Sequence, residues 1–134
     1  MLDTNILIFR HSLDPGLLPD EAAISAVVLG ELAAGVHLVP KDRPDADRVR
    51  ADRLALLQQA ESEFDAVPYG AEAARMFGRM SAAVGREGRS PRARTSDLMI
   101  AATAAVEGLP LFTANPDDFR GLAELVEIRP VPHP

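Results

Sequence analysis

The stretch MLDTNILI at residues 1–8 decides how the rest of the chain is interpreted. An apolar start is followed by an acid at Asp3, two turn and cap formers, and an apolar run that begins at Ile6. This order predicts a short strand that ends at Asp3, a turn, and a helix from about Ile6. Because ligands of open α/β sheets bind just outside the carboxyl ends of the strands, Asp3 is a candidate functional residue. The alternative, for this segment alone, is that Asp3 only caps the helix.

The composition excludes several classes of protein. With 134 residues, the chain is expected to form one domain, residues 1–134, with a substantial core. It has no cysteine, hence no disulfide and no thiolate metal site, which fits a reducing cytoplasm. No apolar run approaches the ~20 residues of a membrane helix, and no signal peptide precedes Asp3, so we expect a cytoplasmic protein without membrane contact. Because the net charge is −6, binding of nucleic acid would need cations or a local basic cluster.

Strand-like and helical segments alternate along the chain. Apolar positions three and four residues apart, together with capping and terminating residues, predict helices over residues 26–36, 45–61, 70–84 and 97–107. Short apolar or alternating segments predict strands at residues 22–25, 63–67, 111–113 and 125–128. This alternation indicates an α/β fold with a central, mainly parallel sheet and helices on both faces.

Four acids are expected to converge at one end of this sheet. Asp3 and Asp118 follow predicted strands, Asp97 opens a helix, and Glu31 lies among apolar residues of another helix. Each has a simpler alternative, such as a helix-capping charge for Asp97 or an exposed position for Glu31. Two carboxylates about 4 Å apart repel by roughly 4 kcal/mol at an effective dielectric constant of 20, so such a cluster is unfavourable without a cation. Hard oxygen ligands favour Mg²⁺ or Mn²⁺ over Zn²⁺, and phosphodiester hydrolysis is the usual chemistry of such a site.

Four segments, in order along almost the whole chain, resemble the motifs of PIN-domain ribonucleases, and more closely those of VapC-type toxins of bacterial toxin–antitoxin pairs. They are DTNILI at residues 3–8, ISAVVLGEL at 24–32, DLMIAA at 97–102 and TANPDDF at 113–119. The resemblance implies a PIN-like α/β/α sandwich, Mg²⁺- or Mn²⁺-dependent cleavage of RNA, inhibition by a small VapB-type antitoxin, and a homodimer. One such motif would be weak, whereas four in order are specific.

The resemblance also assigns individual residues. The catalytic and metal-binding acids of the family match Asp3, Glu31, Asp97 and Asp118, with the neighbouring Asp117 as an alternative for the fourth. The supporting polar positions match Thr4, Asn5, Thr113 and Asn115. We expect Asp3 and Asp97 to hold the main metal, with Glu31 and Asp118 completing its ligands or holding a second ion. Only two residues precede Asp3, whereas family members usually have a longer first strand, so a very short first strand is expected.

Basic residues are concentrated just before Asp97. Four arginines in this loop are candidates for contacts with RNA phosphates: Arg86, Arg89, Arg92 and Arg94. Their alternative is a solvated loop without function. The histidines His11, His37 and His133 are isolated and expected at the surface, so none is assigned as a base.

Other functions fit the sequence less well. A phosphatase of the haloacid-dehalogenase type needs a second Asp two residues after the first, where this chain has Asn5. A metal-dependent DNA nuclease is an alternative, because no residue visibly reads a 2′-hydroxyl group. A catalytically silent module that only binds a partner is the alternative from another class. The complete set of four acids argues against it, since such a module has no reason to keep a repulsive cluster.

Overall fold

The computed structural model describes residues 1–134, in which short strands and longer helices alternate. Helices α1 to α5 span Thr4–Ile8, Ala26–His37, Ala46–Glu63, Ala71–Arg86 and Thr95–Val106, and strands β1 and β2 span Leu111–Thr113 and Ile128–Pro130. The 3₁₀ helices η1 to η4 span Arg10–Ser12, Pro15–Leu17, Arg92–Arg94 and Pro116–Phe119. None of the helices combines the length and apolar character needed to cross a membrane.

The sheet is parallel and is made of very short segments. β1 and β2 pair in parallel, and Phe112 of β1 lies opposite Arg129 on one side and opposite Leu2 on the other. The N–H of Leu2 donates to the carbonyl of Ala23 at 2.9 Å, and a parallel bridge joins Ser25 to Val67. The order across the sheet is residue 67, residues 23–25, residues 1–3, β1 and β2. The α/β class expected from the sequence is therefore confirmed, although most strands pair over only one or two residues.

The last strand lies later in the chain than the sequence pattern predicted, so that prediction was wrong. Pairing begins at Ile128, whereas residues 122–126 turn back on themselves, with the N–H of Val126 bonded to the Leu122 carbonyl at 3.0 Å. Leu122 and Val126 are apolar because this turn is buried, and not because it is a strand. Pro130 is tolerated in β2 because β2 pairs on one side only and needs no donor on the other.

Two further boundaries differ from the prediction. The strand predicted at residues 63–67 is reduced to a single bridge at Val67, and α3 continues to Glu63. The two carboxylate oxygens of Glu63 each accept a hydrogen bond from Arg10 at 2.6 Å. The first helix begins at Thr4 instead of Ile6. It starts earlier because the Asp3 side chain caps it by accepting a hydrogen bond from the Thr4 N–H at 2.8 Å.

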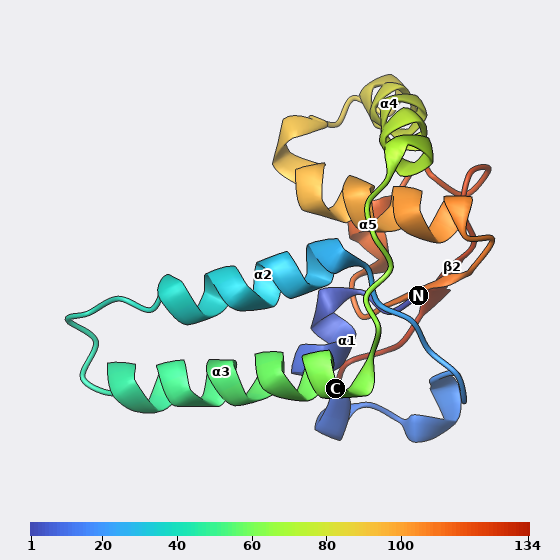
Figure 1. The fold of residues 1–134 in the computed structure, drawn as a ribbon. Coiled ribbons are helices and arrows are strands. Elements are labelled where there is room, and N and C mark those ends of the chain that lie inside the picture. Colours follow the sequence, from blue (N-terminus) through green and yellow to red (C-terminus); the bar gives the residue numbers. More distant parts are fainter.

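The long helices form two pairs (Figure 1). α2 and α3 lie side by side and project away from the sheet, and α4 and α5 pack against each other at another side of the molecule. α5 is apolar almost all round and is buried accordingly at Leu98 and from Ile100 to Ala104, whereas α4 buries only one face, which includes Met80 and Val84. The largest fully buried side chains of the core include Ile6, Ile24, Val28, Leu98, Ile100, Leu111, Phe119 and Leu122. This core fixes the start of α5 and the ends of the first strand and β1 close to one another.

Candidate active site

Asp3 lies at the end of the first strand and is only 4% exposed. Its Oδ1 accepts the capping hydrogen bond of the Thr4 N–H, and its Oδ2 accepts hydrogen bonds from Thr113 Oγ1 at 2.7 Å and Asn5 Nδ2 at 3.0 Å. Burial raises the pKa of Asp3, the hydrogen bonds from Thr113, Thr4 and Asn5 oppose that rise, and the charge of Asp118 adds to it. Asp3 therefore caps α1 and also belongs to a group of interacting acids.

A polar network around Thr113 joins β1 to the start of α1. The Thr113 hydroxyl donates to Asp3 and accepts the backbone N–H of Asn115 at 3.0 Å. The Asn5 side chain accepts the N–H of Ala114 at 3.0 Å and donates to Thr113 Oγ1 at 3.3 Å. Asn115 contributes its backbone here, and as a residue it is exposed. This network fixes the orientation of the Asp3 carboxylate.

Glu31 projects from α2 toward the same place. It is half-buried, and its Oε1 accepts a hydrogen bond from Thr4 Oγ1 at 2.5 Å. Burial raises the pKa of Glu31, the Thr4 hydroxyl opposes this, and the charge of Asp3 adds to it. Thr4 therefore links the second acid to the first.

Asp97 lies in the first turn of α5, which begins at Thr95. The Thr95 hydroxyl donates a hydrogen bond to the Arg92 carbonyl at 3.1 Å. Neither Thr95 nor Ser96 caps α5 with its side chain, although both residue types favour that position. The Asp97 side chain is half-buried and accepts no hydrogen bond from the protein. The pKa of Asp97 is raised to about 7, first by burial and then by the charges of Asp3, Asp118 and Glu31, and the charge of Arg94 opposes this rise. Asp97 thus interacts with all three of the other acids.

The side chains of Asp117 and Asp118 differ in exposure and in their ion-pair partners. The Asp118 side chain is 28% exposed, pairs with Arg94 at 2.5 Å, and raises the pKa values of Asp3 and Asp97. The Asp117 side chain is 67% exposed and pairs with Arg120 at the surface. Of the two neighbours, Asp118 is therefore the one that faces the other acids.

The four acids form a donor set of hard oxygens that suits a divalent cation. In this structure no group of three or more Asp, Glu or His side chains is close enough together to hold a metal ion. Mg²⁺ does not need such a group, because it usually binds through one or two protein carboxylates and keeps several waters. Asp97, which no protein donor engages, and Asp3, whose position the Thr113 network fixes, are the two acids best placed to serve as ligands.

The predicted arginines separate into three groups. Arg92 and Arg94 line a hollow of about 310 Å³ together with Glu31 and Asp97. Arg89 lies beside Asp117, whose backbone carbonyl accepts a hydrogen bond from its Nη1 at 2.5 Å. Arg86 lines a different hollow on α4, so the structure does not bring it to the acids. Ser96 also lines the Arg92 hollow, although it was not predicted from the sequence as a site residue.

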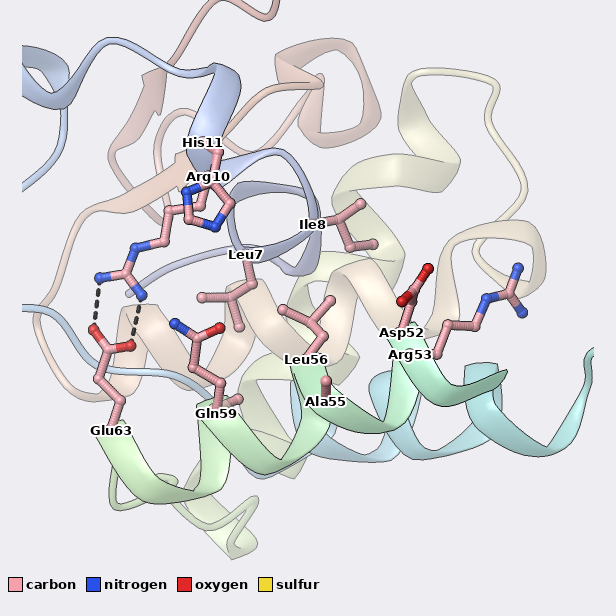
Figure 2. Close-up of a pocket in the computed structure, with 11 residues that line it drawn as sticks. Leu7, Ile8, Arg10, His11, Asp52, Arg53, Ala55, Leu56, Gln59 and Glu63 are labelled. Carbon is pink, nitrogen blue, oxygen red and sulfur yellow. Dashed lines mark hydrogen bonds and ion pairs between the residues drawn. The ribbon is translucent and has the colours of Figure 1, made fainter. Parts of the chain in front are cut away.

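A separate groove lies between α1 and α3 and contains none of the four acids (Figure 2). It has a volume of about 370 Å³, with Leu7, Ile8 and Leu56 among its apolar lining residues and the Arg10–Glu63 ion pair at one end. This groove could not be predicted from the sequence, because its residues come from two segments about 45 positions apart. The three histidines are exposed, as predicted, and His133 stacks on Phe9 with ring centroids 4.0 Å apart.

Comparison with known proteins agrees with the fold and with the order of the motifs. The PIN-domain family profile matches residues 1–125. Ribonuclease VapC5 of Mycobacterium tuberculosis is 38% identical over 133 residues, which cover 96% of this chain and 92% of the relative. Ribonuclease VapC of Rickettsia bellii is 30% identical over 139 residues, which cover 98% of this chain and 96% of the relative.

A solved structure extends this similarity to three dimensions. The crystal structure of a member of the VapBC family of toxin–antitoxin systems, VapBC-5 from Mycobacterium tuberculosis, superposes with a TM-score of 0.78 and 35% identity. The match covers 98% of this chain and 95% of that chain. The chain therefore belongs to the PIN-domain family, among its VapC-type members.

Proposed function

We propose that the chain is a divalent-metal-dependent endoribonuclease and the toxin of a type II toxin–antitoxin pair. The observation that carries this proposal is the electrostatic coupling of four acids from four separate segments, which together with burial raises the pKa of Asp97 to about 7. Such a cluster is unfavourable unless a cation is bound. The similarity to two VapC ribonucleases supports RNA as the substrate.

Asp3 and Asp97 would hold a Mg²⁺ or Mn²⁺ ion, and Glu31 and Asp118 would complete its ligands directly or through water. The donor set fits these ions because all of its members are carboxylate oxygens. When bound, such an ion polarises the scissile phosphate and lowers the pKa of the attacking water.

The remaining residues hold the ligands and the substrate. Thr113 and Asn5 fix the Asp3 carboxylate, and Thr4 orients Glu31, so the acids need little reorganisation before they act. Arg92 lines the hollow beside Asp97 and forms no ion pair, so it is free to contact an RNA phosphate. Arg89 is placed to contact the RNA farther from the acids.

Cleavage of total RNA by purified, antitoxin-free protein in Mg²⁺ tests this function. We expect cleavage by the wild type, none after chelation, and none by Asp118→Asn. Asp117→Asn is the matched control, because it removes the same charge one residue away from a side chain that faces solvent. Equal loss of cleavage in the two variants would contradict the assignment of the fourth acid.

The same assay separates the alternatives. Single-stranded DNA should be cut much more slowly than RNA, and preferential cleavage of DNA would establish the DNA-nuclease alternative. A catalytically silent module would cut neither and would bind no Mn²⁺. The homodimer stays a prediction, which size-exclusion chromatography with light scattering tests.

We infer that the protein partner is a VapB-type antitoxin, because the solved relative is a toxin–antitoxin complex. The groove between α1 and α3 fits an apolar segment of that partner (Figure 2). Its apolar lining includes Ile8, which is 52% exposed although it is large and apolar, and such a side chain favours coverage by a partner. The charged side chains of Arg10, Asp52 and Glu63 offer polar contacts around this apolar surface.

A further inference from the structure

Arg94 occupies an unusual position for a residue expected to bind RNA. It ends η3 and reaches across to η4, where its Nη1 lies 2.5 Å from Asp118 Oδ1. Both side chains are mostly buried, with exposed fractions of 29% and 28%. The pair is therefore better shielded from solvent than the surface ion pairs of the chain, such as Arg120 with Asp117.

The charge of Arg94 acts on the acid cluster and not only on Asp118. The Arg94 side chain lines one hollow together with Glu31 and Asp97, so the guanidinium lies near three of the four acids. Arg92, its neighbour in η3, lines the same hollow but forms no ion pair. Arg94 is thus the one cation of the chain that directly neutralises a member of the cluster.

A guanidinium and a divalent cation cannot both have full use of the same carboxylate. The Asp118 oxygen that accepts from Arg94 directs a lone pair at the guanidinium. A divalent cation bound to Asp118 would be repelled by the positive charge of the neighbouring guanidinium.

We propose that Arg94 is a built-in counter-ion that holds Asp118 in the metal-free protein and competes with the divalent cation for it. This inference rests on the proposed function, since it assumes that the acids bind a metal. Arg94 is a positioning residue, because it acts on the metal site through Asp118. When Asp118 turns to the cation, the guanidinium is released into the hollow that it shares with Arg92, where it adds a positive charge for an RNA phosphate.

The test is the affinity of the intact protein for Mn²⁺ alone, measured by isothermal titration calorimetry without RNA. Arg94→Gln should bind Mn²⁺ about tenfold more tightly than the wild type, which corresponds to about 1.4 kcal/mol. Arg92→Gln is the matched control, because it removes the same charge from the same short helix and the same hollow. It should change the affinity less than about threefold. Arg94→Lys keeps the charge near Asp118 and should restore most of the weaker wild-type affinity.

The outcomes separate this inference from the proposed function. If the wild type binds no Mn²⁺ at millimolar concentration, the proposed metal site is wrong. If the wild type binds and Arg94→Gln behaves like Arg92→Gln, the metal site stands and the competition is refuted.

A comparison in the Asp118→Asn background keeps the test decisive if Arg94→Gln alone is poorly folded, because Asp118→Asn removes the carboxylate that this variant leaves unpaired. Combined with Asp118→Asn, which removes the contested charge, Arg94→Gln should no longer change the Mn²⁺ affinity more than Arg92→Gln does. A gain of about tenfold that persists in the Asp118→Asn background would overturn the proposal.

Discussion

Replacing Asp97 by Asn should stabilise the metal-free protein, and it should do so in a pH-dependent way. Asn has almost the same shape as Asp and is also compatible with the first turn of a helix. It removes a charge that folding places among three other carboxylates. Because folding raises the pKa of Asp97, the folded chain binds its proton more tightly than the unfolded chain does. The group therefore contributes stability at low pH that is lost as the pH rises from about 4 through about 7.

The magnitude follows from the two pKa values. The difference between the ordinary value of 3.8 and about 7 in the folded chain corresponds to about 4 kcal/mol above pH 7. Asp97 is only half-buried, so solvent screens part of this destabilisation. We therefore expect Asp97→Asn to raise the free energy of unfolding by about 2 kcal/mol at pH 8. At pH 4 the carboxyl is protonated in the folded chain and about half protonated in the unfolded chain, so the gain should fall to about 0.5 kcal/mol.

Urea denaturation followed by circular dichroism, in the presence of a chelator at pH 4 and pH 8, measures both values. Asp65→Asn is the control, because Asp65 is exposed, forms no ion pair and lies outside the cluster. It should change stability by less than about 0.5 kcal/mol at either pH. A gain for Asp97→Asn that is the same at both pH values, or that Asp65→Asn reproduces, would refute the argument that the four acids converge.

Three other outcomes are expected. Thr113→Val removes the hydroxyl that donates to Asp3 and should lower the free energy of unfolding by about 1–3 kcal/mol. Thr103→Val, the control at a buried hydroxyl that bonds within α5, should lower it by less than about 1 kcal/mol. Equal losses in urea denaturation would contradict the network around Thr113. Millimolar Mn²⁺ should raise the melting temperature of the wild type, because an ion at a hundredfold excess over its Kd stabilises the folded state by about 2.7 kcal/mol. It should raise the melting temperature of Asp3→Asn less. An unchanged melting temperature of the wild type would count against the metal site. Ile8→Asp should weaken binding of the antitoxin at least tenfold in calorimetry. Leu38→Asp, at a side chain that is 73% exposed just after α2, should leave this affinity unchanged. Equal weakening by the two variants would exclude the groove as the docking surface.

The arrangement of the acids depends on apolar packing that lies behind them. Asp3 follows the buried Leu2, Asp97 precedes the buried Leu98, and Asp118 precedes the buried Phe119. Each acid is therefore adjacent in sequence to a side chain that the core holds in place. A repulsive cluster persists because this packing, and not attraction among the acids, determines where their backbones lie.

The sequence by itself determined the elements that depend on local signals. Ser25 caps α2 with a hydrogen bond from the Val27 N–H at 3.1 Å, and the apolar spacing of residues 71–86 produces an amphipathic α4. The fold class followed from the alternation of such elements, and the candidate acids followed from their places beside them. These features could be predicted because each depends on residues that lie within a few positions of one another.

The tertiary structure decided what depends on distant partners. The strand predicted at residues 125–128 begins only at Ile128, after a turn over residues 122–126, because apolar periodicity does not distinguish a strand from a turn over so few residues. The pairing of Asp118 with Arg94 from 24 positions away had no signal in the sequence, which also left Asp117 as an alternative for the fourth acid. Ion pairs, burial and pKa values depend on the distances between side chains from different elements, and only the packing of the whole chain sets those distances.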